Sequence, residues 1–284
     1  MNYLELPNYN LNKTLLGGQA FNWDYINGYY CGFAIDKLIK ITPNKNGILW
    51  QTYPDNNDYM YISNLLNIDI DFDLIIQSIQ KDENIKRAVQ YVENVRILKQ
   101  GFDQTLMSFI LTSHKSIKAV RKIVRDLSKT YGNPIEVDNM IFYTFPSAKV
   151  IASLTEDQLR CLGAGFRAKY LLNAAKALNS NTVGSWLADY TEEGARNKLL
   201  ELNGVGDKIA DCILTFSLGF YTVTPIDVWA LRVLHELYKV DPKSNYKTLR
   251  KWYADYFNQH TAWAGQFLFE YLRENYKHIK RYHS

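Results

Sequence analysis

The stretch "LNGVGDKIAD", residues 202–211, decides how the second half of this chain is interpreted. It follows the amphipathic segment "EEGARNKLLEL" (192–202) and continues into the apolar run "CILTFSLGF" (212–220). Glycine ends a helical pattern, and an aspartate such as Asp207 is typical of the start of a new helix. The pattern therefore predicts a helix, a tight hairpin through Gly204 and Gly206, and a second helix, over about 192–220.

The hairpin has two interpretations. Because Gly204 and Gly206 carry no side chains, backbone N–H groups at the start of the second helix can face outward and bind a phosphate. The same glycines can instead allow close packing in an ordinary αα-hairpin. A bare Gly-x-Gly favours the packing interpretation. Residues farther along the chain must decide between the two.

Those residues lie in "TVTPIDVWALRVLHELY" (222–238), where Asp227 stands nineteen positions after Lys208. Asp227 precedes an amphipathic helix, so an N-cap is its simplest role. A lysine and an aspartate at two helix starts can also face one cleft, where the helix dipole favours a neutral amine and an ionised carboxylate. A neutral amine can attack a sugar carbon and form a Schiff base, while a carboxylate stabilises the cationic sugar.

The stretch 202–234 resembles the helix-hairpin-helix, Gly/Pro-Asp signature of DNA base-excision glycosylases, and within them the 8-oxoguanine DNA glycosylase/AP lyases. Hairpin, lysine and Pro-x-Asp occur in the order and spacing of that signature. Further similar stretches extend the resemblance over nearly the whole chain; they are "LLGGQAFNW" (15–23), "QTLMSFILTSHKSIKAV" (104–120), "LGAGFRAKYL" (162–171) and "AWAGQFLFEYLRE" (262–274).

The resemblance implies roles at the matching positions. Lys208 would attack the deoxyribose C1′, and Asp227 would assist cleavage of the glycosidic bond. Cys212 and Phe269 would pack on the two faces of the extruded base, although both also fit a core. Gly18 would offer its carbonyl to the N7–H that distinguishes 8-oxoguanine from guanine, or else serve only as a turn glycine.

The DNA-contacting positions depart from the family pattern in several places. His114 replaces an asparagine, Ala119 replaces an arginine, and Phe166 replaces a tyrosine. In the family pattern a glutamine reads the pairing edge of the lesion, and Gly265 occupies its place here. Gln266 lies one position away, so a surface role for Gln266 is an alternative. Loss of the arginine predicts looser discrimination of the base opposite the lesion. The residues expected to contact DNA are Gly204, Gly206, His114, Lys115, Phe166 and Arg167.

Composition limits the cofactors and partners. The chain has 284 residues, a net charge of +4 and a pI near 8.7, which permit a polyanionic partner. Cys31, Cys161 and Cys212 are too scattered for a disulfide framework or an iron–sulfur cluster, and the resemblance requires no metal or other cofactor. No apolar run approaches a membrane span, and the N-terminus lacks the features of a signal peptide. We expect a cytoplasmic monomer that acts on chromosomal DNA.

The hydrophobic pattern predicts an α+β fold. The first 75 residues carry strand features and the turn signals "NG" (27–28), "PNKNG" (43–47) and "PDNND" (54–58), which favour an antiparallel sheet domain. From about residue 71, apolar residues recur at helical spacing almost to the end, as in 72–92 and 104–132. We therefore expect an N-terminal sheet domain over 1–75 and a mostly α-helical domain pair over 76–284, containing the helix-hairpin-helix.

The resulting functional hypothesis is a bifunctional base-excision repair enzyme. It would bind duplex DNA containing an oxidised purine, extrude 8-oxoguanine, excise it through a lysine Schiff base and nick the strand by β-elimination. One alternative is a monofunctional alkylation-type glycosylase of the same fold, a group that generally lacks a lysine at the end of the hairpin. The other is a non-catalytic helix-hairpin-helix DNA-binding protein.

Overall fold

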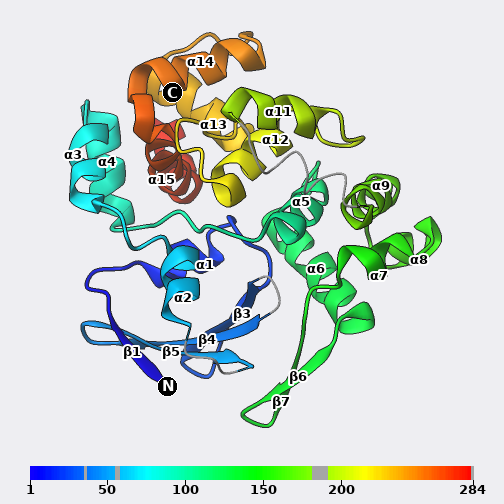
Figure 1. The fold of residues 1–284 in the computed structure, drawn as a ribbon. Helices are drawn as coiled ribbons and strands as arrows, with labels where there is room; N and C mark the ends of the chain where they lie inside the picture. Colours follow the sequence, from blue (N-terminus) through cyan, green and yellow to red (C-terminus); the bar gives the residue numbers. More distant parts are fainter. Residues whose placement is uncertain (35–36, 55–57, 181–190, 283–284) are drawn as a thin grey trace.

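The computed structural model describes residues 1–34, 37–54, 58–180 and 191–282. A five-stranded antiparallel sheet from the N-terminal part lies beside a larger helical part (Figure 1). The predicted α+β class, with the strands first and a helix-hairpin-helix in the helical part, is confirmed. None of the described helices combines the length and the apolarity that a membrane span requires.

The strands of the sheet are β1 (Asn2–Glu5), β2 (Trp23–Ile26), β3 (Tyr29–Ala34), β4 (Lys37–Asn44) and β5 (Gly47–Tyr53), in the order β1-β5-β4-β3-β2. Strands β2, β3 and β4 each pair with the next strand along the chain, and β1 pairs with β5. Asn27 and Gly28 both have positive φ (49° and 88°), the backbone that a two-residue hairpin turn requires. The turn signal at 43–47 joins β4 to β5. In the signal at 54–58, residues 55–57 lie outside the described residues, as do residues 35–36 between β3 and β4.

Both faces of the sheet are covered. Helices α1 (Leu11–Leu16) and α2 (Tyr59–Leu66) share one core with the sheet, which includes Leu15, Trp23 and Trp50. On the other face a second hairpin, β6 (Pro134–Val137) and β7 (Met140–Tyr143), buries Val137 in a separate apolar cluster of the sheet. This hairpin interrupts the region expected to be helical. The sequence does not predict it, because strands of four residues are too short to show a period.

The helical part surrounds one large hydrophobic core. Its helices are α3 (Phe72–Ile79), α4 (Glu83–Val92), α5 (Phe102–Ile110), α6 (Ile117–Tyr131), α7 (Ala148–Ala152), α8 (Glu156–Cys161), α9 (Arg167–Asn179), α11 (Glu192–Leu200), α12 (Asp207–Ile213), α13 (Val228–Arg232), α14 (Tyr246–Phe257) and α15 (Thr261–Tyr282). The π-helical turns η1 (Leu214–Leu218) and η2 (Val233–Leu237) extend α12 and α13, and the 3-10 turn η3 (Asn258–His260) precedes α15.

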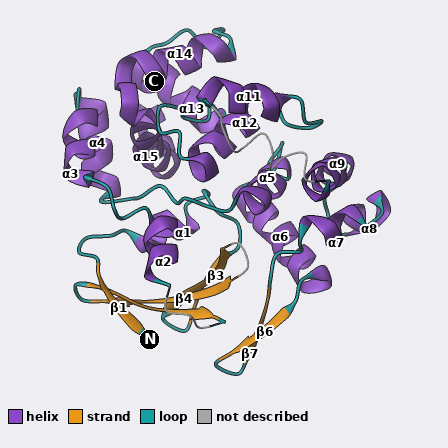
Figure 2. Ribbon diagram, in the orientation of Figure 1, coloured by secondary structure: helices purple, strands orange, loops and turns teal. Residues whose placement is uncertain are grey.

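Two helical stretches of the sequence divide into separate helices. The side chain of Asp82 accepts hydrogen bonds from the backbone N–H groups of Asn84 and Ile85, so α4 has its own N-cap and the pattern over 72–92 is broken after α3. Residues 104–132 form α5, a turn and α6. Helices α5–α9 form one group and α11–α15, with α3 and α4, form another; in the view of Figure 2 the sheet lies below the second group and to the left of the first.

Candidate active site

A cavity of about 1060 Å³ opens where the helical groups meet the N-terminal part. It is lined by the turn after α1, the turn between α5 and α6, the hairpin before α12, the loop before α13, and α15. The structure therefore gathers residues that are up to about 250 positions apart in the chain. The cavity is lined by most of the predicted site residues, namely Lys208, Asp227, Gly18, Cys212, Phe269, Gln266, Gly204, Gly206, His114 and Lys115.

The hairpin between α11 and α12 uses its two glycines differently. Gly204 has φ +92° and packs against Tyr170, whose Cδ1 would lie 2.8 Å from a Cβ at this position. Gly206 is the N-cap of α12 in extended conformation, and a Cβ there would meet no atom within 4 Å. Gly204 is therefore required by the turn and its packing, whereas Gly206 leaves the backbone at the start of α12 open on the cavity side.

Lys208 lies in the first turn of α12 with its side chain half-buried. Its Nζ is 3.1 Å from Thr112 Oγ1 and 5.2 Å from the centroid of the Phe109 ring. Phe109 lies in the last turn of α5 and Thr112 in the turn that follows it, so the end of α5 and this turn hold the amine in the cavity. Sequence reasoning did not single out either residue, because only tertiary packing brings them to the lysine.

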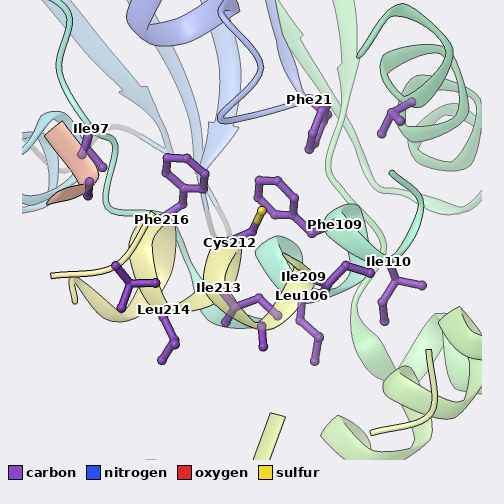
Figure 3. Close-up of a cluster of buried hydrophobic side chains, with 14 of the residues drawn as sticks. Phe21, Ile97, Leu106, Phe109, Ile110, Ile209, Cys212, Ile213, Leu214 and Phe216 are labelled. Carbon is purple, nitrogen blue, oxygen red and sulfur yellow. The ribbon is translucent and has the colours of Figure 1, made fainter. Parts of the chain in front are cut away.

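Cys212 follows Lys208 by one helical turn and lies in a group of aromatic and aliphatic side chains that includes Phe21, Phe109 and Phe216 (Figure 3). Its side chain is buried, and burial raises the pKa of the thiol to about 12 although nearby Lys208 opposes the change. A thiol in this environment stays protonated. It therefore provides a polarisable apolar contact at the cavity wall.

Asp227 is the N-cap of α13, as its simplest interpretation predicts. Its Oδ1 accepts hydrogen bonds from the backbone N–H groups of Trp229 (2.8 Å) and Ala230 (2.9 Å). Both bonds use the same oxygen, so Oδ2 takes no part in the cap. Because Asp227 also lines the cavity, the cap holds the carboxylate in place and leaves one oxygen for a ligand.

A buried polar chain connects the helix of Lys208 to the loop of Asp227. The Ile226 N–H donates to Tyr246 Oη (3.2 Å), and the Tyr246 hydroxyl donates to Asp211 Oδ2 (2.8 Å). Asp211 lies on α12, is completely buried, and also accepts from Arg250 Nε (3.2 Å). Burial raises the pKa of Asp211, whereas Arg250 acts in the opposite direction. The arginine and the tyrosine thus satisfy a carboxylate that joins α12 to the residue before Asp227.

Gly18, another residue of the cavity wall, follows α1 in a left-handed conformation, with φ +110°. A Cβ at this position would lie 2.6 Å from Ile117 Cδ1, so the turn and the start of α6 can approach this closely only with glycine. No described residue donates a hydrogen bond to the Gly18 carbonyl. Gly18 lines the cavity, which is where the predicted contact between its carbonyl and a base would form.

Position 265 cannot hold the side chain that the family pattern has there. A Cβ on Gly265 would lie 2.8 Å from Thr224 Cβ and closer still to Thr224 Oγ1. The buried Thr224 fills that space and lines the cavity itself. The next residue, Gln266, also lines the cavity and is buried, so the structure does not place it on the surface. Phe269 follows one turn later on α15 and is half-buried at the cavity wall.

Phe166 and Arg167 are the two predicted site residues that do not line the cavity. The Phe166 ring is 52% exposed, whereas Arg167 is buried with its guanidinium 4.3 Å from that ring. Arg167 Nε donates to the Ser113 carbonyl (2.6 Å), and Nη1 donates to the Ala164 carbonyl (3.2 Å). In this structure Arg167 braces the turn after α5 against the turn before α9, and Phe166 presents an aromatic face beside it.

Comparisons with known proteins agree with this arrangement. Residues 4–106 match the 8-oxoguanine DNA glycosylase N-terminal domain, and residues 107–259 match the HhH-GPD superfamily of base excision DNA repair proteins. An N-glycosylase/DNA lyase from Saccharomyces cerevisiae is 32% identical over 175 residues. Those residues are 57% of this chain and 46% of the yeast protein, so the match covers slightly less than half of that relative.

Two solved structures are similar over nearly their entire length. MBOgg1 in complex with a low-affinity DNA ligand has a TM-score of 0.89 and 30% identity, covering 96% of this chain and 99% of that one. The 8-oxoguanine glycosylase/lyase of Clostridium acetobutylicum, in complex with duplex DNA that contains cytosine opposite 8-oxoguanine, has a TM-score of 0.88 and 26% identity. That match covers 97% of this chain and 99% of the clostridial one.

Proposed function

This chain belongs to the HhH-GPD superfamily of base excision DNA repair proteins and carries the N-terminal domain of the 8-oxoguanine DNA glycosylases, and from this premise we propose that it is a bifunctional N-glycosylase and AP lyase that removes 8-oxoguanine from duplex DNA. One observation carries the proposal: Lys208 and Asp227 line a single cavity. A cavity of about 1060 Å³ is large enough for an extruded purine nucleotide.

The proposed reaction begins with DNA bound through its phosphates by the hairpin of Gly204 and Gly206 and by basic residues such as Lys115. The damaged base rotates into the cavity at a cost of a few kcal/mol, offset by contacts with Cys212 and Phe269. The carbonyl of Gly18 accepts from the N7–H that 8-oxoguanine has and guanine lacks. This single hydrogen bond distinguishes the lesion from the normal base.

The covalent step assigns separate roles to the two catalytic residues. Lys208 Nζ forms a bond to C1′ while the C1′–N9 bond to the base breaks, and the Asp227 carboxylate stabilises the positive charge that develops on the sugar. Opening of the sugar ring gives a Schiff base. Loss of a proton from C2′ then expels the 3′ phosphate by β-elimination, so the strand is nicked 3′ to the lesion.

Borohydride trapping tests the proposal. Reduction during incubation with a duplex containing 8-oxoguanine is expected to link the wild-type chain covalently to DNA. The Lys208→Gln variant is expected to give no adduct and to excise the base at least about a hundredfold more slowly. Lys198→Gln, a matched change on the exposed face of α11, should trap like the wild type.

Three results would contradict the proposal. Excision without trapping would indicate a monofunctional glycosylase, and binding without excision would indicate a DNA-binding protein without chemistry. An adduct formed by Lys208→Gln would move the nucleophile to another residue.

A further inference from the structure

Glu270 is a buried carboxylate behind the cavity wall, next to the lining residue Gln266, and the proposed reaction does not use it. Its side chain has no exposed surface and lies one helical turn after Gln266 on α15. Its Oε1 accepts a hydrogen bond from Gln266 Nε2 (3.3 Å), and its Oε2 pairs with Arg273 Nη2. A Cβ at Gly17 would overlap Oε1, so the carboxylate also packs against the backbone that leads into Gly18.

Above a pH of about 7 the Glu270 carboxyl is ionised, and the carboxylate then determines which way the Gln266 amide faces. A carboxylate only accepts hydrogen bonds, so Gln266 must turn its NH₂ group towards Glu270 and its oxygen away. No donor among the described residues reaches Gln266 Oε1, and Gln266 lines the cavity. The amide oxygen is therefore available as an acceptor for a bound base.

Thr224 excludes a side chain at position 265, so the amide at this part of the cavity wall is that of Gln266. The amide of Gln266 comes from the adjacent position of α15 and requires a partner that fixes its orientation, because an amide can present either its oxygen or its NH₂ group. Glu270 supplies this partner from the same helix, at the i+4 spacing that brings side chains together.

We propose that Glu270 is a specificity-determining positioning residue: it holds the Gln266 amide oxygen towards the cavity and thereby selects purines that carry N–H donors at N1 and N2. Guanine-type bases carry N1–H and an N2 amino group on the pairing edge, whereas adenine-type bases carry an acceptor at N1, no amino group at C2, and their donor at N6. The inference rests on the proposed function. It assigns the choice between oxidised guanine and oxidised adenine to the Glu270–Gln266 pair.

A matched pair of lesions tests the inference. 8-Oxoguanine and 8-oxoadenine both carry N7–H and an 8-oxo group, so the chemical groups that they offer to the cavity differ only at the pairing edge. The measurement is the ratio of single-turnover excision rates for the two lesions in otherwise identical duplexes. Because the same preparation is used for both, the ratio does not depend on the fraction of the protein that is folded.

Glu270→Gln should lower the preference for 8-oxoguanine at least about tenfold, since a neutral amide at 270 accepts either orientation of Gln266. Glu274→Gln, one turn farther on the exposed side of α15, is the matched control and should leave the ratio unchanged. Gln266→Met should lower the ratio as well. Adding Glu270→Gln to Gln266→Met should then change nothing further, because Glu270 acts through the amide.

Two results would overturn the inference. The first is a Glu270→Gln variant that slows excision of both lesions equally, which is the behaviour of a purely structural residue. The second is an additive loss in the double variant. Failure of the proposed function would be recognised separately, because the wild-type chain would then neither excise 8-oxoguanine nor be trapped on it, and the inference would fall with it.

Discussion

Glu270 is also a carboxyl group whose pKa is strongly changed by its surroundings. Burial raises the pKa of its carboxyl to about 7, although Arg273 and Lys13 act in the opposite direction, and the neighbouring Glu274 adds to the rise. Loss of hydration outweighs the ion pair with Arg273 because the carboxylate has no exposed surface.

This pKa predicts a pH-dependent stability that one substitution removes. A carboxyl whose pKa is higher in the folded chain than the unfolded value of 4.5 contributes stability fully below pH 4.5 and loses it as the pH rises through 7. Between pH 4.5 and 8, the free energy of unfolding of the wild type should fall relative to Glu270→Gln by up to about 3 kcal/mol. Urea unfolding at a series of pH values measures this difference. Parallel pH profiles for the two proteins would contradict it.

At the scale of elements, the relative placement of α12 and the loop before α13 sets the distance between the amine and the carboxylate of the site. The chain from Ile226 through Tyr246 to Asp211 is the polar connection between them. Arg250 closes it with a 2.6 Å ion pair to Glu192 on α11, so both helices of the helix-hairpin-helix are attached to the same network.

Tyr246→Phe should therefore affect both stability and chemistry. The change leaves the buried Ile226 N–H without its acceptor, which costs about 1–3 kcal/mol, while Asp211 Oδ2 keeps only its hydrogen bond from Arg250 Nε. We expect the single-turnover excision rate to fall about tenfold or more, because the loop that carries Asp227 is no longer held to α12. Denaturant unfolding and single-turnover kinetics measure the two effects.

Tyr256→Phe is the control for this prediction. Tyr256 donates to Oδ2 of Asp82 (2.9 Å), which is the N-cap of α4, and neither residue lines the cavity. Its loss should lower stability while leaving the excision rate near that of the wild type. Equal rates for both tyrosine variants would show that the network stabilises the fold without positioning the site.

The elements differ in how far the sequence alone predicts them. The helix-hairpin-helix and the hairpin at Asn27–Gly28 are predictable because local chemistry, glycine in a left-handed turn, specifies them. The hairpin β6–β7 was missed because each strand has only four residues. Its apolar Val137 is explained only by the sheet face against which it packs.

At the scale of the whole molecule, the site depends on distant segments meeting. Lys208 and Asp227 were predictable because one motif spans both. The partners of Lys208 on α5 and the exclusion of a side chain at 265 by Thr224 were not, since they arise from tertiary packing. One feature of the sequence pointed to Glu270: it is a charged residue within the apolar stretch "AWAGQFLFEYL" (262–272). A buried charge requires partners, so this signal pointed to a polar cluster.

Under the proposed function, recognition of the base opposite the lesion would involve more than one element. The resemblance implies an arginine at position 119 in addition to Arg167 for this contact, but position 119 is alanine here and Arg167 donates to the carbonyls of Ser113 and Ala164. These hydrogen bonds hold two turns together across the α5–α9 group. Reading an orphaned base with Arg167 would require breaking them, which adds a cost to any such contact.

We therefore predict that excision of 8-oxoguanine differs by no more than roughly tenfold among duplexes with cytosine, thymine, guanine or adenine opposite the lesion. A bidentate arginine contact discriminates bases by about 1–3 kcal/mol, and this chain has no free arginine at position 119 to supply it. Ala119→Arg should raise the preference for cytosine, while Lys122→Arg, an exposed change on the same helix, should not. Single-turnover rates on the four duplexes provide the measurement. A strong preference of the wild type for cytosine would mean that Arg167 leaves Ser113 when DNA binds, and that the brace between the two turns is released as the opposite base is read.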